Sequence, residues 1–330
     1  MALAIVDWRQ ADRARLAALY AGEIRRWSDV LGWDTAASWD HIDLGRRLGT
    51  VPGLLALDAN GAIAGWGFYL LHRGVLQIGG ISAVSQPATT ALVDAICSSE
   101  AAANAQSALV FAFTDAPGLS DALARRGLTV GAYDYLVKRL PLPGLPDRRP
   151  GAAGASSDPG GGQSVSPALC HWRDREAESV AALLRLAYPG ADGGRPFAPG
   201  GTVEEWQEYV DQLVAAAGCG TIMPESCYVV PNGPDRISGV VLVTRLAART
   251  AHIAQLAVDP QATRRGLGRM LVDAACARAG AAGCDRITLL VEGRNTAARR
   301  LYEDSGFQAV ARFVSAGTAQ SGTSLVESRV

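Results

Sequence analysis

The chain has 330 residues, a hydrophobic fraction of 48% and a net charge of −1 at pH 7, which predicts a folded protein of two domains. A pI near 6.4 argues against general nucleic-acid binding. No apolar run is long enough for a membrane span, and charged residues follow the first apolar residues too soon for a signal peptide. The six cysteines lack C-x-x-C pairs and zinc spacing, so we expect reduced thiols, no metal and a cytoplasmic location.

The N-terminal part of the chain combines an apolar strand with several tryptophans. Residues 75–83 predict a central strand, and the run after it has neither a glycine pair nor an arginine. Trp27, Trp33 and Trp39 precede this strand. They are interpreted either as helix-packing residues in a core or as the lining of a pocket.

A change of composition separates this part from the rest of the chain. Residues 141–167 are rich in Pro, Gly, Ala and Ser, which cannot form a packed core and are typical of a flexible linker. We therefore predict one domain at residues 1–140 and a second at residues 168–330.

The most informative segment begins as an apolar strand over residues 253–258. Pro260 cannot donate to a strand ladder, so the strand should stop near the preceding residue. Gly266 and Gly268 then allow a ligand to approach the backbone closely. Apolar residues recur at helical spacing from Leu267 onward, which predicts a helix that begins at this turn.

The start of this helix has the features of an anion site. Its first N–H groups are unpaired and carry partial positive charge. Arg264, Arg265 and Arg269 surround that end, where arginine opposes the helix dipole unless an anion is bound. A solvated basic turn is the alternative interpretation. A dinucleotide site is disfavoured because the third glycine and a later ribose-binding acid are missing.

A second strand, over residues 287–292, leads into a short helix. Asn295 is the expected N-cap, and Gly306 is the expected C-terminal stop. Ala298, Leu301 and Tyr302 form the inward face of this helix. A lone tyrosine on an apolar helical face is usually a core residue. Its position one βα unit after the glycine turn favours a functional role instead.

In order and spacing, these motifs resemble the GNAT superfamily of acetyl-CoA-dependent N-acetyltransferases. The matching pieces are Val258-x-Pro260, Arg264-Arg265-Gly266-Leu267-Gly268, Asn295-x-x-Ala298-x-x-Leu301-Tyr302 and Gly306-Phe307. The match covers about residues 168–330. The family usually has Gln or Arg where this chain has Thr263, so one side-chain contact differs while the backbone cradle is retained.

The resemblance implies an α+β fold of two tandem GNAT-like domains, each with a mixed, mostly antiparallel sheet flanked by helices. It implies acetyl-CoA as the co-substrate, no metal, and a small-molecule or peptide amine as the acceptor. We expect neither nucleic acid nor membrane as a partner, and either a monomer or a homodimer. The cofactor-binding residues implied are Leu256, Ala257, Val258, Arg264, Arg265, Gly266, Leu267, Gly268, Arg269, Asn295 and Tyr302.

The expected reaction is direct attack of a neutral amine on the thioester carbonyl. The resemblance implies that a backbone N–H near Leu256 stabilises the developing oxyanion. Tyr302 is placed to protonate, or at least hydrogen-bond, the departing thiolate. The base is Glu292, His252 or a water chain, with Glu292 preferred because it ends its strand toward the expected cleft. The alternative function is an acyl-CoA-binding sensor or scaffold without turnover.

Short sequence echoes indicate an internal duplication. Trp172-Arg173 repeats Trp8-Arg9, and Gly306-Phe307 resembles Gly127-Leu128. Residues 1–140 are therefore expected to be a degenerate GNAT-like copy without the cofactor motif. A structural or substrate-shaping role is the prediction for that copy.

Overall fold

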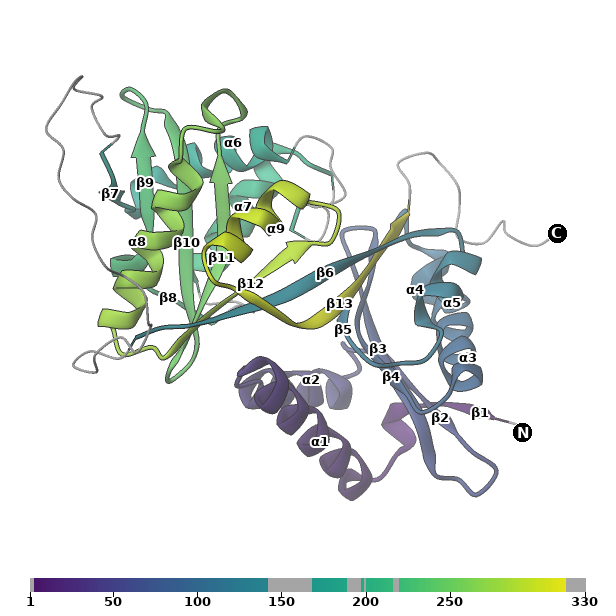
Figure 1. Cartoon of the computed structure of the whole chain (residues 1–330). Coiled ribbons are helices and arrows are strands. Elements are labelled where there is room, and N and C mark those ends of the chain that lie inside the picture. Colours follow the sequence, from purple (N-terminus) through teal and green to yellow (C-terminus); the bar gives the residue numbers. More distant parts are fainter. Residues whose placement is uncertain (1–2, 142–167, 189–196, 199, 216–219, 319–330) are drawn as a thin grey trace, which may run out of the picture.

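Figure 1 shows the computed structural model of the chain. The structure describes residues 3–141, 168–188, 197–198, 200–215 and 220–318. Residues 142–167, which make up nearly all of the predicted linker, lie outside these ranges. Residues 3–141 are referred to below as the N-terminal half and residues 168–318 as the C-terminal half.

The N-terminal half contains both helices and strands, and its fourth strand has the bounds that the sequence predicted. The strands are β1 (Ala4–Asp7), β2 (Gly53–Leu57), β3 (Ile63–His72), β4 (Val75–Ala83), β5 (Ser107–Phe113) and β6 (Leu128–Arg139). The helices are α1 (Arg13–Leu31), α2 (Ala36–Leu48), α3 (Gln86–Cys97), α4 (Glu100–Ala103) and α5 (Leu119–Arg125), with a 3₁₀ turn at Trp8–Gln10.

The C-terminal half has a similar order of elements, with one additional short strand. Its strands are β7 (Cys170–His171), β8 (Thr221–Ile222), β9 (Tyr228–Pro231), β10 (Ile237–Ala247), β11 (Thr250–Val258), β12 (Arg286–Glu292) and β13 (Gln308–Thr318). Its α-helices are α6 (Ala177–Ala187), α7 (Val203–Val214), α8 (Leu267–Ala281) and α9 (Thr296–Asp304). Short 3₁₀ turns lie at Asp174–Glu176, Pro224–Ser226 and Pro260–Ala262.

All the strands join one continuous sheet. Its order is β1-β2-β3-β4-β5-β13-β6-β12-β11-β10-β9-β7, with β8 also paired to β10. The neighbouring pairs are antiparallel except β4 with β5 and β11 with β12. This mostly antiparallel sheet with helices on its faces confirms the predicted α+β class. The sheet is symmetric about the β13–β6 pair. From one edge to this centre the strands are β1 to β5, and from the other edge they are β7, β9, β10, β11 and β12, in the same relative order.

The last strand of each half pairs with the other half. β6 pairs with β12, with Leu136 opposite Leu289, and β13 pairs with β5. The two long strands also pair with each other, with Tyr133 opposite Phe313. Figure 1 shows β6 and β13 running between the halves as a crossed pair. Each half of the sheet is therefore completed by a strand from the other half.

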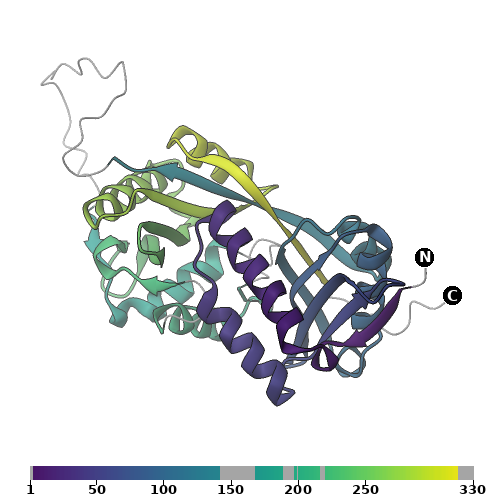
Figure 2. The same ribbon diagram turned by 90° about the horizontal axis from the view of Figure 1, so that it is seen from below.

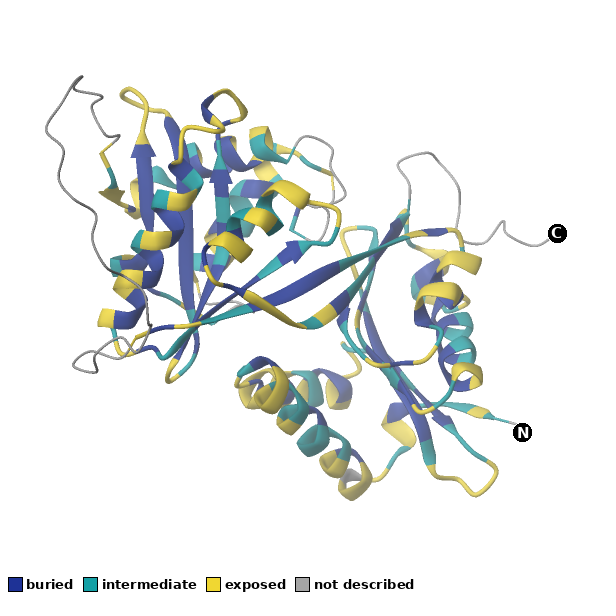
Figure 3. Cartoon of the chain, viewed as in Figure 1, coloured by how far each residue is buried: buried dark blue, intermediate teal, exposed yellow. Residues whose placement is uncertain are grey.

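A small aromatic cluster fills the crossing. Its buried members are Leu31, Tyr133, Tyr135 and Phe313. Leu31 is the last residue of α1, which runs beside α2 and reaches toward the C-terminal half in the view of Figure 2. In Figure 3 the middle of β6 is buried at the crossing, whereas the first residues of β13 and the outer faces of the helices are exposed. The N-terminal half thus sends one helix end and one strand into the other half.

A break in the chain between residues 155 and 156 should leave a folded one-to-one complex of the two fragments, because β6 and β13 each keep their ladders in the other fragment. Residues 1–155 expressed alone should aggregate or stay unfolded, since β5 then loses β13, β6 loses both β12 and β13, and bare strand edges are exposed. Light scattering after size-exclusion chromatography of single and co-expressed fragments checks this. A monomeric 1–155 fragment that unfolds cooperatively would show that β6 can close on β5 instead.

Candidate active site

The site is a fork between the two parallel strands of the C-terminal half. β11 and β12 pair only where Thr250–Ile253 lies opposite Arg286–Leu289. Beyond that point β12 continues along β6 as far as Glu292, while β11 continues along β10 as far as Val258. A register shift in the β10–β11 pair falls at Ala254, where the strands separate. The facing edges of both strands are therefore open.

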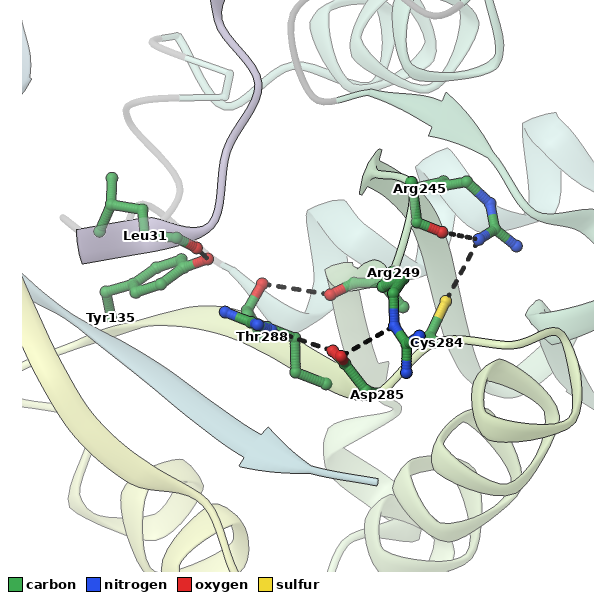
Figure 4. Close-up of polar contacts among 10 residues, drawn as sticks. Leu31, Tyr135, Arg245, Arg249, Cys284, Asp285 and Thr288 are labelled. Carbon is green, nitrogen blue, oxygen red and sulfur yellow. Dashed lines mark hydrogen bonds and ion pairs between the residues drawn. The ribbon is translucent and has the colours of Figure 1, made fainter. Parts of the chain in front are cut away.

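Polar contacts hold the closed end of the fork (Figure 4). The side chain of Asp285 accepts a hydrogen bond from Nε of Arg249 at 2.9 Å, and the Asp285 N–H donates to the carbonyl of Arg249 at 3.0 Å. Thr288 Oγ1 donates to the carbonyl of Ala251 at 3.3 Å, which links β12 to β11 a second time. These contacts therefore hold β11 and β12 together just before the two strands separate.

The backbone of Leu256 faces the open edge of β11. The Asp259 N–H donates to Ser238 of β10 at 2.9 Å, and alternate residues of a strand direct their N–H groups to opposite edges. Leu256 and Val258 therefore direct their N–H groups into the fork. The carbonyl of Leu256 points the same way, because it accepts a hydrogen bond from the Tyr188 hydroxyl at 3.4 Å rather than from β10. The N–H named from the sequence for the oxyanion is thus at the open edge.

A cavity of about 410 Å³ occupies the fork. Both halves of the chain line it. The C-terminal half contributes the two open strand edges and α9, with Gln255, Leu256, Val258, Leu290, Val291, Glu292, Asn295, Ala298, Leu301 and Tyr302. The N-terminal half contributes aromatic side chains, namely Trp27, Trp33, Phe111 and Tyr133. Of the three tryptophans singled out from the sequence, Trp39 instead packs in the core against Trp66 and Phe68.

Tyr302 lies on α9 and lines the cavity. Its ring packs against Phe307 at 5.7 Å between centroids, and only 6% of the residue is exposed to solvent. Burial, with a smaller contribution from the nearby Tyr188, raises the pKa of Tyr302 above its ordinary value, so the hydroxyl remains a proton donor. The side chain of Asn295 accepts from the Ala298 N–H at 3.0 Å, which confirms the predicted N-cap of this helix.

The glycine turn forms the predicted helix start. Gly266 is the N-cap of α8 with φ of 78°, and α8 begins at Leu267. A Cβ added to Gly266 would meet no atom within 4 Å, so this glycine faces open space. A Cβ on Gly268 would lie 3.1 Å from the Leu301 side chain, so Gly268 permits α8 and α9 to approach each other. The first N–H groups of α8 therefore border an exposed turn.

The three arginines of the turn differ in what they contact. Arg264 and Arg265 are exposed beside the turn, and Arg264 has a positive φ of 60°, which is uncommon outside glycine. Arg269 donates to the carboxylate of Asp273 at 2.9 Å and to the carbonyl of Asp304 at 3.1 Å. Its guanidinium thus joins α8 to the end of α9, while Arg264 and Arg265 are left to provide positive charge at the turn.

The two side chains considered as bases have different surroundings. His252 is buried, and its Nδ1 lies 2.8 Å from Thr288 Oγ1. Burial lowers the pKa of His252 to about 3, so its imidazole is neutral near pH 7 and is a weak base. Glu292 ends β12 opposite Tyr133 and lines the cavity. The structure therefore brings Glu292, Tyr302 and the Leu256 backbone around one cavity.

Sequence reasoning missed a polar group in the fork. Gln255 is buried within the apolar strand β11, and its amide donates to the Tyr209 hydroxyl at 3.0 Å. Its side-chain oxygen accepts from Tyr188 at 3.4 Å, and burial raises the pKa of Tyr188 to about 12. A glutamine inside an otherwise apolar strand was the available signal. The two tyrosines come from α6 and α7 or their ends, and nothing local in the sequence connects them to it.

The corresponding turn of the N-terminal half is closed. The N-cap of α3 is Ser85, with φ of −154°, and its side chain accepts from the Ala88 N–H. Pro87 follows in the first turn and has no N–H to offer. The amide groups that border an open turn at α8 are therefore partly used or missing at α3.

Within the described residues, no group of three or more His, Cys, Asp or Glu side chains is placed to hold a metal ion. Among the helices that the structure describes, none combines the length and the apolar character needed to cross a bilayer.

The segment that contains this site resembles known proteins. Residues 179–307 match the sequence model of the acetyltransferase (GNAT) family. Over 64 residues the chain is 55% identical to a mycothiol acetyltransferase of Beutenbergia cavernae, a match that covers 19% of this chain and 22% of that protein. The chain thus matches only about a fifth of the length of this relative.

Two solved structures share the fold over nearly the whole chain. A GCN5-related N-acetyltransferase from Sphaerobacter thermophilus has a TM-score of 0.56 at 16% identity, with 95% of each chain covered. A tandem GNAT protein from the clavulanic acid biosynthesis pathway has a TM-score of 0.50 at 12% identity, with 96% of this chain and 98% of that chain covered. At these identities the likeness is one of fold, and it includes the tandem arrangement.

Proposed function

We propose that the chain is an N-acetyltransferase that moves an acetyl group from acetyl-CoA to a primary amine, because residues 179–307 match the model of the acetyltransferase (GNAT) family. The observation that carries the proposal is the fork. An open strand edge, an accessible helix N-terminus and a buried tyrosine lie around a single cavity there. Residues 1–140 are proposed to be a copy without a cofactor site that completes the sheet and shapes the acceptor side.

The residues of the fork fit acetyl-CoA. We assign the pyrophosphate to the N–H groups from Arg264 to Arg269, because the first turn of a helix offers unpaired donors and positive potential. Arg264 and Arg265 add charge there. The pantetheine arm is assigned to the open edge of β11 at Leu256 and Val258, where an extended chain can pair like an added strand. Bound in this way, the co-substrate supplies the activated acetyl group.

The proposed chemistry uses three groups of this chain. A neutral amine nitrogen forms a bond to the carbonyl carbon, and the Leu256 N–H stabilises the charge that develops on oxygen. The carbon–sulfur bond then breaks, and Tyr302 gives its proton to the departing thiolate. Glu292 takes the proton that the attacking amine loses and passes it to solvent. Tyr302 recovers its proton before the next turnover.

Glu292→Gln should lower kcat/KM by about 10²-fold, the lower end of the range for general acid–base catalysis. The loss should be largest below the pKa of the amine, where a proton must be removed before attack. Free-thiol release followed from pH 6 to pH 9 measures it. Glu303→Gln, on the exposed side of α9, is the matched control and should behave like the wild type. An unchanged rate in Glu292→Gln would assign the base to a water chain.

Gly266→Glu should weaken acetyl-CoA binding by at least about 2 kcal/mol, because a carboxylate would replace the anion and charge-assisted hydrogen bonds would be lost. Calorimetry on the wild type should give one equivalent bound per chain. Gly283→Glu is the matched control, since Gly283 also has a positive φ, of 84°, and open space around it. Equal affinities in the two folded variants would place the cofactor elsewhere, and two equivalents would contradict a copy without a cofactor site.

Tyr302→Phe should reduce saturating turnover by about 10²-fold while acetyl-CoA affinity changes little, because ring packing is kept and only the proton donor is lost. Because burial raises the pKa of Tyr302, the donor stays protonated and the loss should remain constant up to about pH 10. Turnover and melting temperature are measured together. Tyr228→Phe, on β9 outside the cavity, is the control. Wild-type turnover in Tyr302→Phe would remove this hydroxyl from the mechanism.

A further inference from the structure

The acceptor side of the cavity is a continuous aromatic wall that both halves build. From the N-terminal half, the rings of Trp27 and Trp33 lie 5.3 Å apart. Phe111 lies 5.3 Å from Phe313 and 6.4 Å from Phe197, which carries the wall across to the C-terminal half. Aromatic side chains are therefore the main lining that an acceptor meets on this side.

The polar groups behind the wall already have partners. Trp33 Nε1 donates to the Tyr135 hydroxyl at 2.7 Å, and that hydroxyl donates to the Leu31 carbonyl at 2.7 Å. The amide of Gln255 is hydrogen-bonded to two tyrosine hydroxyls. A hydroxyl-rich acceptor such as a sugar would lose its water contacts against this wall and find few new partners there, which costs free energy for each unpaired group.

The charge of the lining favours a cation. Among the described residues that line this cavity there is no Lys and no Arg. Glu292 is the acidic side chain at the cavity, and burial keeps His252 neutral. An acceptor with a carboxylate or phosphate would bury its charge without a cationic partner. An ammonium, in contrast, is attracted to the faces of Trp and Tyr rings.

From the wall, the satisfied polar groups and the charge of the lining, we infer that the acceptor is a primary amine on an apolar or aromatic body without acidic groups. The inference rests on the proposed acetyltransferase function and names its acceptor class. The cavity of about 410 Å³ must also hold the pantetheine arm and the acetyl group of the co-substrate, so the body of the acceptor must be small. Trp33 of the N-terminal half is then a specificity-determining residue of the C-terminal site.

The test compares three amines on the full-length protein with saturating acetyl-CoA. 2-Phenylethylamine has the inferred character, phenylalanine adds a carboxylate to the same body, and glucosamine replaces the body by a sugar. We expect kcat/KM for thiol release to be at least about tenfold higher with 2-phenylethylamine than with either of the others. If phenylalanine or glucosamine is the better acceptor, the inference is overturned while the proposed function stands.

Variants of Trp33 separate ring recognition from folding. Trp33→Leu should lower kcat/KM for 2-phenylethylamine by about tenfold through the lost ring face, and acetyl-CoA affinity should stay the same. Trp33→Phe keeps a ring but loses the hydrogen bond to Tyr135, and it should retain most of the activity. Equal effects of the two substitutions would overturn ring recognition.

Calorimetry keeps the inference testable without turnover. With CoA present, 2-phenylethylamine should bind the wild type and Trp33→Phe but not Trp33→Leu. Binding without thiol release would support the acceptor class and overturn the proposed enzymatic function. No binding of 2-phenylethylamine to the wild type, with acetyl-CoA still bound, would overturn the acceptor class.

Discussion

The exchange of β6 and β13 between the halves is the constraint on which the rest of the structure depends. β12 can leave β11 after Leu289 because its other edge is already paired to β6 through Glu292. Without that ladder, the end of β12 would present unpaired backbone groups on both edges, each costing about 1–3 kcal/mol if buried. The open fork in the C-terminal half therefore requires a strand from the N-terminal half.

The same crossing orients the helix that carries Tyr302. Asp134 of β6 is 3% exposed and lies 2.9 Å from Arg312 of β13 and 3.3 Å from Arg299 of α9. A buried carboxylate needs such partners, and the loss of one would leave an uncompensated charge. Arg299 and Tyr302 both lie on α9. The ion pair between Asp134 and Arg299 therefore connects the exchanged strands to the helix that carries the proposed proton donor.

Local chemistry was enough to predict several elements. The strand at β4 was identified as an apolar run, the start of α8 at Leu267 from the glycine turn and the apolar residues at helical spacing, and the N-cap from the residue type of Asn295. The strand exchange was not predictable in this way, because side-chain alternation tells which face is buried but not which strand lies alongside. The contributions of Trp33 and Gln255 to the cavity could not be predicted either, because their hydrogen-bond partners, Tyr135 and Tyr209, lie far away in the sequence.

The N-terminal half has its own fork, since β4 and β5 pair only up to Ile78 and Val110. Aromatic rings fill much of it. A Cβ on Gly79 would lie 2.3 Å from the Phe68 ring, so this glycine accommodates a side chain rather than a ligand. The remaining cavity, about 170 Å³, shares Trp27 and Trp33 with the larger cavity next to it. We therefore propose that the N-terminal half, whose own helix turn is closed, still acts on the reaction, because Trp27 and Trp33 line both cavities.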